Sequence, residues 1–462
     1  MIFKNELKEF NKKYNEPYGD SRNDGKYNTI LSKNYVLGLD SEKTFHDNII
    51  VYGGNKYEQE ENFIIPNLLK ANGSYVVIDR YNLYEKCKDF FRKEGYKIKV
   101  FNPEHQDQSC FYNPIKYCQD RDISSFVDCI LQGRHNIDPF NYAANVLLTA
   151  LIRLVKTYPE EKQTFRTVLS LLRQVESDEN NPNAKSPLDE FFDNVQKNNP
   201  DSFALADYKS FKMGTYQQRK SIILELEELI ERIEYITEKD DVELETIGDE
   251  KTILFIKMKD NSYSPLILSM IIQASNNLKR RLLDNYTRGF FVTKGNERKF
   301  IQNEEDADNF IKSHPDWKKE YSYPGLANHC QFILTDFCNL GEISCPTKLD
   351  IFRTRIQNIP TNISYYIFID NVKHLKELYS PNPEVLTECF DTIIFLGSKD
   401  LNTCQYISGM YQFREEQFLM KNKDHKTKNS IDTKDVYELD KQKCIILIKY
   451  LKPIIDYKYH LK

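Results

Sequence analysis

The sequence predicts an α/β fold with a parallel-rich central sheet and an inserted all-α domain. Short apolar runs alternate with segments of helical period on both sides of residues 122–244, as in βαβ units. Within residues 122–244 the pattern is helical. Near residue 53, a glycine-rich turn joins an apolar strand to a helix, which is the layout of a phosphate-binding loop.

Composition bounds the class of protein. The chain has 462 residues, 40% of them hydrophobic, enough for two or three domains. A formal net charge of -5 argues against a generally basic nucleic-acid coat protein, although it allows a local basic patch. Ten scattered cysteines without a C-x-x-C pair predict free thiols and no metal site. We find no signal peptide and no apolar run approaching the roughly 20 residues of a membrane helix, so we expect a chain that is soluble by itself.

The first part of the chain begins with a polar, loop-like extension at residues 1–46, in which only residues 35–39 are a strand candidate. The alternating pattern follows and ends near residue 121. We expect strand 48–52, helix 58–71, strand 74–79, helix 82–94 and strand 96–101. Pro66 falls inside the first of these helices, where a kink is expected because proline lacks the amide hydrogen.

The inserted domain, residues 122–244, contains recognisable helix starts. Asp138 before Pro139 forms an N-cap pattern, and Ser186-Pro187-Leu188-Asp189 is a capping box with proline at the first helical position. Residues 216–236 form a long amphipathic helix. The sheet domain would then comprise residues 47–121 and 245–462.

The second half of the sheet domain returns to short apolar runs. We expect a helix opened by Ser264-Pro265 and a surface insertion at 285–328, which contains the only tryptophan. A lysine-rich loop near 420–435 is expected to face solvent. The remaining strands are expected at 252–257, 331–335, 364–369, 392–396 and 444–449.

The glycine-rich loop lacks the chemistry of its type. The pattern G-x-x-x-x-G-K-[ST], laid on Gly53, meets Glu58, Gln59 and Glu60 where glycine, lysine and a hydroxyl belong. Gln59 cannot neutralise phosphate charge, Glu60 replaces the hydroxyl that holds Mg²⁺, and acidic side chains repel a triphosphate. Lys56 is the only rescue candidate, three positions early. The degenerate loop comprises Gly53, Gly54, Asn55, Lys56, Tyr57, Glu58, Gln59 and Glu60; a plain helix N-terminus is the alternative interpretation.

Motifs along nearly the whole chain resemble TraG/TraD-type coupling proteins of conjugative type IV secretion, in their cytoplasmic part. They include Pro66-Asn67-Leu68, Ala71-Asn72-Gly73-Ser74-Tyr75-Val76-Val77, Ile247-Gly248-Asp249-Glu250-Lys251-Thr252 and Phe395-Leu396-Gly397-Ser398-Lys399-Asp400. The resemblance implies a RecA-like P-loop NTPase fold, an all-α domain that meets DNA and the relaxase complex, and a hexameric ring. The family's amino-terminal membrane helices have no counterpart in this sequence.

The sequence departs from that family at its catalytic positions. Where the family has Asp-Glu at the end of a strand, for the metal and for activating water, this chain has Thr335 and Asp336. Where the family ends another strand in a glutamine that senses the γ-phosphate, it has Asp370. A family arginine stretch appears as residues 359–362, without arginine. These departures predict no catalytic residues.

Basic residues offer possible DNA contacts, although an ordinary charged helix face explains them as well. Tyr208 and Phe211 lie nearby and could stack on bases. The candidate contacts are Lys209, Lys212, Arg219, Lys220, Lys279, Arg280 and Arg281.

We therefore expect a catalytically inactive coupling-protein homologue, an adaptor or structural component of a conjugative DNA-transfer system that needs no cofactor. The alternative is a divergent, active DNA-translocating ATPase that uses ATP and Mg²⁺ through Lys56 and Asp336. A third, weaker hypothesis is a sensor that binds nucleotide without hydrolysing it. Expected partners are type IV secretion or relaxosome proteins, an active coupling protein, further copies and DNA. The expected location is the cytoplasm, with any membrane contact at the inner face of the bacterial membrane made through a partner.

Overall fold

The computed structural model describes most of the chain. Asp138 and residues 423–430 of the lysine-rich loop lie outside the described part. The described residues are 7, 10, 28–39, 48–131, 139–175, 184–284, 289–294, 297–301, 303–322, 328–341, 352, 355–356, 359–360, 362–379, 384–422 and 431–461. Among the helices of these residues, none combines the length and the apolar character needed to cross a membrane.

The main sheet has nine strands in the order β16-β15-β14-β3-β13-β10-β4-β6-β5. Neighbours from β14 to β5 pair in parallel, and β15 and β16 add an antiparallel edge. This confirms the predicted α/β fold, while β16 was not predicted. The strands are β3 Ile49–Tyr52, β4 Ser74–Asp79, β5 Lys97–Phe101, β6 Thr252–Lys257, β10 Cys330–Leu334, β13 Ile363–Ile369, β14 Thr392–Phe395, β15 Lys443–Ile448 and β16 Ile454–Tyr457.

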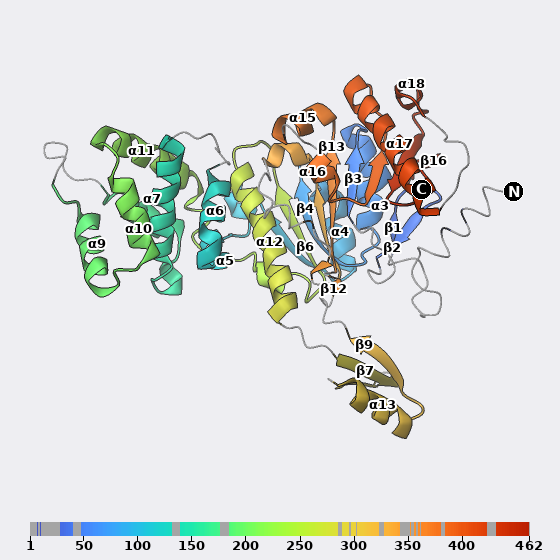
Figure 1. Ribbon diagram of the computed structural model, residues 1–462, viewed down its shortest axis with the longest axis horizontal. Coiled ribbons are helices and arrows are strands. Elements are labelled where there is room, and N and C mark those ends of the chain that lie inside the picture. The colour runs from blue at the N-terminus through green and yellow to red at the C-terminus, as the bar shows by residue number, and fades with distance from the viewer. Residues whose placement is uncertain are drawn as a thin grey trace.

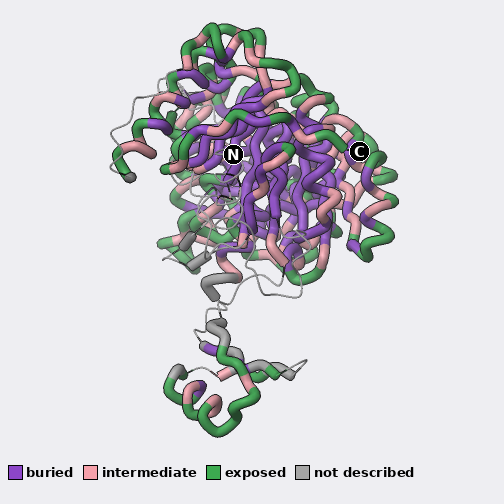
Figure 2. Tube along the Cα trace, turned by 90° about the vertical axis from the view of Figure 1, so that its right-hand side faces the viewer, coloured by how far each residue is buried: buried purple, intermediate pink, exposed green. Residues whose placement is uncertain are grey.

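Helices cover both faces of the sheet (Figure 1), and the buried residues concentrate in this part of the molecule (Figure 2). Successive strand residues point to opposite faces, so β3 contributes to two apolar cores. The helical segment after β3 and α4 (Leu83–Lys93) pack on one face. The other face carries α12 (Ser264–Asp284), α15 (Val372–Leu378) and α17 (Leu401–Asn422). Since the connections after β3 and after its neighbours β13 and β14 pass over opposite faces, a crevice is expected at the carboxyl end of β3.

The segment after β3 is helical from Lys56 to Leu68 but not uniform. It consists of α2 (Lys56–Gln59), a π-helical turn η1 (Glu60–Ile64) and α3 (Ile65–Leu68). Pro66 is the second residue after the π turn, so the kink expected at this proline takes the form of a local change of helix type.

Beside the sheet lies a group of helices (Figure 1), and the described residues from 123 to 233 contain no strand. The capping box at Ser186 is confirmed, because its side chain accepts from the Asp189 amide and the Asp189 side chain accepts from the Ser186 amide. The domain boundaries stay a prediction. The helices are α6 Ile123–Ile130, α7 Pro139–Val155, α8 Phe165–Leu172, α9 Pro187–Asn198, α10 Phe203–Lys212 and α11 Tyr216–Ile233.

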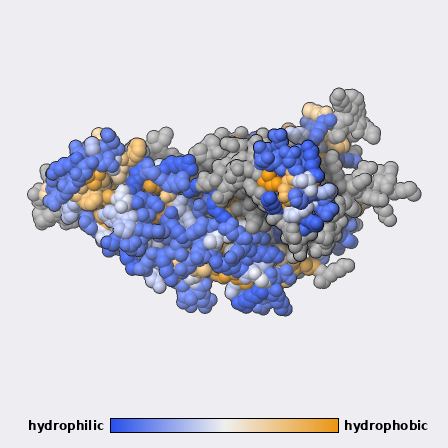
Figure 3. Space-filling view, turned by 90° about the horizontal axis from the view of Figure 1, so that it is seen from below, coloured by the Kyte–Doolittle hydropathy of each residue, from blue (hydrophilic) through white to orange (hydrophobic). Residues whose placement is uncertain are grey.

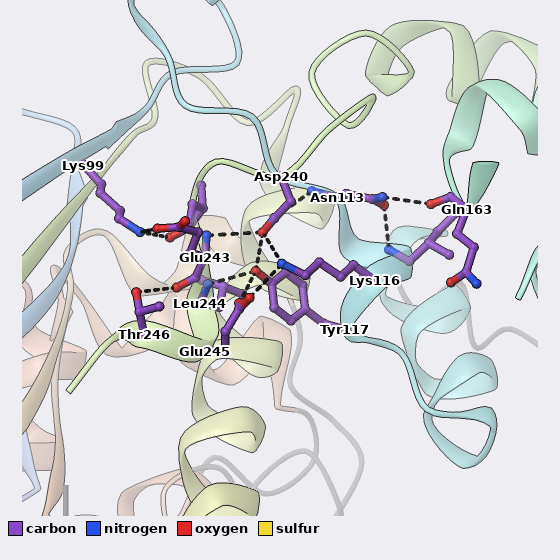
Figure 4. A network of polar contacts seen from close by, with 12 residues as sticks. Lys99, Asn113, Lys116, Tyr117, Gln163, Asp240, Glu243, Leu244, Glu245 and Thr246 are labelled. Atoms are coloured by element: carbon purple, nitrogen blue, oxygen red, sulfur yellow. Dashed lines mark hydrogen bonds and ion pairs between the residues drawn. The ribbon is translucent and has the colours of Figure 1, made fainter. Parts of the chain in front are cut away.

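Two chain segments join these helices to the sheet, and polar contacts tie the segments together (Figure 4). The Tyr117 hydroxyl lies 2.5 Å from Asp240 Oδ2 and 2.7 Å from Glu245 Oε2. Lys116 Nζ donates to the same two side chains, at 3.1 and 2.7 Å. From β5, the buried Lys99 donates to Glu243 at 2.9 Å. We call Lys99, Lys116, Tyr117, Asp240, Glu243 and Glu245 the junction cluster.

Among the described residues, three smaller sheets contain strands that the sequence did not predict, although β2 confirms the strand candidate at 35–39. One of the three pairs β11 (Arg355–Ile356) with β12 (Ile359–Pro360). In the expected insertion, β7 (Gly289–Lys294) pairs with β8 (Glu297–Ile301) and β9 (Lys318–Ser322), and α13 (Glu304–Ser313) packs against them. Near the start, β1 (Asn28–Ile30) pairs with β2 (Val36–Gly38). From below, the described surface is mainly hydrophilic, with hydrophobic residues in small patches (Figure 3).

Candidate functional site

The glycine-rich loop is held by the ends of two neighbouring strands. Gly53 and Gly54 have positive φ angles of +68° and +71°, which favour glycine. A Cβ on Gly53 would lie 2.4 Å from the Gly397 carbonyl oxygen. The Gly53 amide donates to Ile369 at 2.9 Å and the Gly54 amide to Gly397 at 2.7 Å. Two backbone amides of the loop therefore donate to carbonyl groups of the protein itself.

The next turn is closed by a capping box. The Asn55 side chain accepts from the Glu58 amide at 3.0 Å, and Glu58 Oε2 accepts from the Asn55 amide at 2.9 Å. This reciprocal pair fixes the helix start, which is Lys56 and not the expected Glu58. Glu58 Oε1 also accepts from Lys458 Nζ at 2.7 Å.

Gln59, at the lysine position of the loop pattern, is turned into the protein. Its side chain is 1% exposed, and its Nε2 donates to the Gly53 carbonyl at 3.1 Å and to Asp370 Oδ1 at 3.0 Å. The structure thus brings two of the sequence-predicted positions together. Burial raises the pKa of the Asp370 carboxyl above its ordinary value.

The remaining charged groups of the loop also have partners in the chain. Glu60 is buried and forms an ion pair with Lys86 of α4. Its Oε1 is buried without a hydrogen-bond partner among the described residues. Lys56 Nζ lies 3.7 Å from the centre of the Tyr81 ring. Burial, with Asp336 and other carboxylates nearby, raises the pKa of Tyr81 to about 12.

At the end of β10 the two degenerate positions have separate roles. The Thr335 hydroxyl is buried and donates to the Ile78 carbonyl at 2.9 Å. Asp336 has a φ of +51°, and its Oδ2 lies 2.6 Å from Arg80 Nη1. A guanidinium group therefore faces the carboxylate that stands at the family's water-activating position. Sequence reasoning missed Arg80, whose only signal is its place directly after β4.

The residues present do not fit a magnesium-bound triphosphate. Such a ligand needs a lysine, a hydroxyl and a metal carboxylate, whereas the chain has Gln59, a buried ion-paired Glu60 and Thr335. The described residues contain no His/Cys/Asp/Glu group arranged to hold a metal ion. A cavity of about 420 Å³ nevertheless lies beside the loop. Its lining is Gly53, Gly54, Asn55, Glu58, Asp370, Leu396, Gly397, Ser398, Lys399, Val436, Tyr437, Leu439, Asp440, Lys441 and Lys458.

Several candidate DNA contacts in the helical group have structural partners. Lys212 donates to Asp189 at 2.9 Å, and the largely buried Arg219 donates to the Gly214 carbonyl at 2.6 Å. Lys209 is exposed and Lys220 is half-buried. The expected stacking residues Tyr208 and Phe211 are both buried, so the structure contradicts that part of the prediction.

The three basic candidate residues on α12 also contact other parts of the protein. Lys279 is largely buried, with its ammonium 5.8 Å from the centre of the Tyr365 ring. Arg280 lies 3.7 Å from Asp122. Arg281 donates to the Glu245 carbonyl and pairs with Asp249. Arg280 and Arg281 thus fasten α12 to the segments that lead into and out of the helical group, whereas Lys279 contacts β13 of the main sheet.

Comparison with solved structures defines the class of fold. The chain resembles the unbound bacterial conjugative coupling protein TrwBdeltaN70 (9% identity, 99% of this chain and 93% of that chain, TM-score 0.58). It resembles the plasmid coupling protein TrwB in complex with the non-hydrolysable GTP analogue GDPNP (9% identity, 98% and 92%, TM-score 0.59). VirB4 of Thermoanaerobacter pseudethanolicus is similar too (11% identity, 96% and 99%, TM-score 0.50). The fold is thus the RecA-like P-loop NTPase fold.

Sequence comparison supplies the family. Residues 7–289 match the family described as Type IV secretory system Conjugative DNA transfer. The chain belongs to this family of TraG/TraD-type coupling proteins, as its motifs predicted. No curated protein sequence matches the chain.

Proposed function

We propose that this coupling-protein homologue acts without hydrolysing a nucleoside triphosphate, as an adaptor or structural component of a conjugative DNA-transfer system. The observation that supports the proposal most is the position of Gln59. Gln59 stands where a phosphate-binding loop has its lysine, and its side chain donates hydrogen bonds to the Gly53 carbonyl and to Asp370. A triphosphate would have to displace these bonds and approach the carboxylates of Glu58 and Asp370, which line the adjoining cavity and repel it.

The partners follow from the family and belong to the same proposal. They would be type IV secretion or relaxosome proteins, including a catalytically active coupling protein. Because the proposed role is binding, nucleotide turnover would come from such a partner. We place the protein in the cytoplasm, and we propose that any attachment to the inner face of the cell membrane is made through a partner.

Binding of a fluorescent ATP analogue tests the proposal. It is measured on the full-length protein at low salt, with and without Mg²⁺. We expect no binding at ~1 mM, where even a site worth about -4 kcal/mol would be detected. A TraG/TraD-type ATPase with an intact loop serves as the positive control. Micromolar binding would contradict the proposal.

A divergent, active DNA-translocating ATPase is the second candidate. The cavity of about 420 Å³ beside the loop favours it, because lysines 399, 441 and 458 contribute to the lining. Lys56 and Asp336 would take over catalysis after leaving Tyr81 and Arg80. This candidate requires DNA-stimulated ATP hydrolysis that Lys56→Ala abolishes and the exposed control Lys93→Ala preserves. Tight, Mg²⁺-independent nucleotide binding without turnover would instead indicate a sensor.

A further inference from the structure

Strand β16 lies at one edge of the main sheet, close to the carboxyl terminus (Figure 1). Among the described residues, β16 pairs only with β15. The opposite edge, β5, is covered by the chain itself, because the Val100 carbonyl accepts from the Cys110 amide at 2.7 Å. An edge strand without such a cover presents its backbone groups to other chains. The two edges of the sheet thus differ in the backbone groups that they leave for a partner.

The register of the β15–β16 pair shows which backbone groups of β16 face outward. In an antiparallel pair, opposite residues alternate between hydrogen-bonded and non-bonded positions. The Lys458 amide donates to the Gln442 carbonyl at 2.7 Å, so this position is bonded. Alternation from it directs the backbone groups of Ile455 and Tyr457 to the outer edge. The Tyr457 carbonyl accepts there from the Lys33 amide at 2.9 Å, which, among the described residues, leaves the groups of Ile455 for a further strand.

The side chains around this edge combine apolar surface with positive charge. Ile455 and Tyr457 are 39% and 45% exposed, and Tyr450, in the turn after β15, is 41% exposed. Four lysine ammonium groups lie 4.7–5.7 Å from the centres of the two tyrosine rings, and they belong to Lys33, Lys421, Lys443 and Lys449. Lys449 also pairs with Asp391, whereas the other three form no ion pair with the described residues.

These lysines determine what kind of strand fits the edge. A second copy of the chain, pairing through its own β16, would bring two sets of lysines together, and like charges on paired strands oppose each other. Added strands gain affinity from main-chain hydrogen bonds and specificity from their side chains. An extended segment with apolar and acidic side chains on each face would contact Ile455 and Tyr457 and also neutralise the lysines. Charge complementarity thus favours an acidic segment over a second copy.

We propose that β16 is a docking edge for an extended acidic segment of a partner protein, which adds a strand to the nine-stranded main sheet. The segment pairs with the backbone of Ile455 and continues towards the turn at Tyr450. The other end of the edge is closed, because the Lys33 amide bonds to the Tyr457 carbonyl. This inference rests on the proposed function, since it names the surface through which the adaptor binds a partner.

Fluorescence anisotropy on the full-length protein at low salt tests the docking edge. The probe is a labelled peptide that repeats two valines and two glutamates, so that each face of its strand carries both. We expect saturable binding to the wild type, and binding at least about tenfold weaker for a peptide with lysine in place of glutamate. A peptide with N-methyl groups on every valine loses main-chain donors on both edges and should also bind at least about tenfold more weakly.

Substitutions in the protein test the same edge from the other side. Ile455→Pro removes an outward amide without touching the bonds to β15, so it should weaken peptide binding at least about tenfold. Leu461→Pro is the matched control, since both side chains are 39% exposed, and it should bind as the wild type does. The charge reversals Lys33→Glu and Lys443→Glu, combined in one protein, should weaken binding by a similar factor. The exposed Lys93→Glu is their control and should leave binding unchanged.

The outcomes separate the two proposals. No binding by the wild type overturns the docking edge, and so does full binding by a cooperatively folded Ile455→Pro protein or by the N-methylated peptide. If Ile455→Pro fails to fold, the double charge reversal decides, and unchanged binding by it overturns the docking edge. Self-association that Ile455→Pro abolishes, measured by sedimentation velocity, would assign the edge to a second copy and overturn the acidic partner. Nucleotide binding by the wild type would overturn the proposed function and leave the peptide result as it stands.

Discussion

The loop and the junction cluster use the same chemistry for different ends. In both, lysines and carboxylates far apart in the sequence meet in partly buried ion pairs, as in Lys458 with Glu58 and Lys116 with Glu245. The loop pair borders a cavity of about 420 Å³ at the carboxyl end of β3. The junction cluster instead ties together the two segments that lead to the helical group (Figure 4). The chemistry of the two ion pairs is therefore the same, and only their surroundings, a cavity or a junction between segments, distinguish them.

Breaking the junction cluster should have the largest effect on stability. Asp240 accepts from Lys116 and Tyr117, and its side chain is 6% exposed. Asp240→Ala removes one carboxylate partner of the partly buried Lys116 ammonium. We therefore expect the free energy of unfolding to fall by about 3 kcal/mol. Urea denaturation of the full-length protein measures the change. Its exposed neighbour provides the control Asp241→Ala, for which about 0.5 kcal/mol or less is expected. Equal effects of the two substitutions would argue against a structural role for the cluster.

Removing the side-chain hydrogen bonds of the loop should lower the free energy of unfolding by a smaller amount. Gln59→Ala removes the donor to Gly53 and Asp370, and a lost hydrogen bond to a buried group costs about 1–2 kcal/mol. We expect the unfolding midpoint to fall without any change in nucleotide turnover, which we propose is absent. The exposed Gln108→Ala should leave the midpoint unchanged. Stability unaffected by Gln59→Ala would mean that the side chain does not hold the loop.

The difference between the two regions also explains what the sequence could reveal. Strand β3, the capping box at Ser186 and the substitutions at 58–60 are local patterns, so each was visible without the structure. The partners were not, because 311 residues separate Gln59 from Asp370. No motif marks Arg80 as the partner of Asp336.

Elements with weak periodicity were missed for a related reason. Strand β16 is short and half-exposed, with the pattern Ile-Ile-Asp-Tyr, and β8 is mostly polar, with Glu-Arg-Lys-Phe-Ile. Only pairing with a neighbouring strand defines such segments. The same limit applies to the basic residues proposed for DNA, since Arg219 and Arg281 bond to backbone carbonyls that charge counting cannot reveal.

The smallest expected effect concerns the pH dependence of the junction. The hydrogen bond from Lys99, together with Lys97, lowers the pKa of Glu243 from 4.5 to about 2. A carboxyl whose pKa is lower in the folded chain adds stability above its unfolded pKa and loses it as the pH falls towards the folded value. The wild type should therefore be more stable than Glu243→Gln above about pH 4.5, and the difference should vanish between about pH 4.5 and pH 2.

We expect a difference below about 1 kcal/mol at neutral pH, because the Glu243 side chain is 44% exposed and solvent screens the pair. Urea midpoints of the two proteins, measured from pH 2 to 7, follow this change, and Glu104→Gln serves as a control away from the cluster. A difference that stays constant over the whole range would show that Glu243 acts through packing. Its disappearance would show that the charge pairing with Lys99, and not only side-chain shape, holds this end of the junction to the sheet.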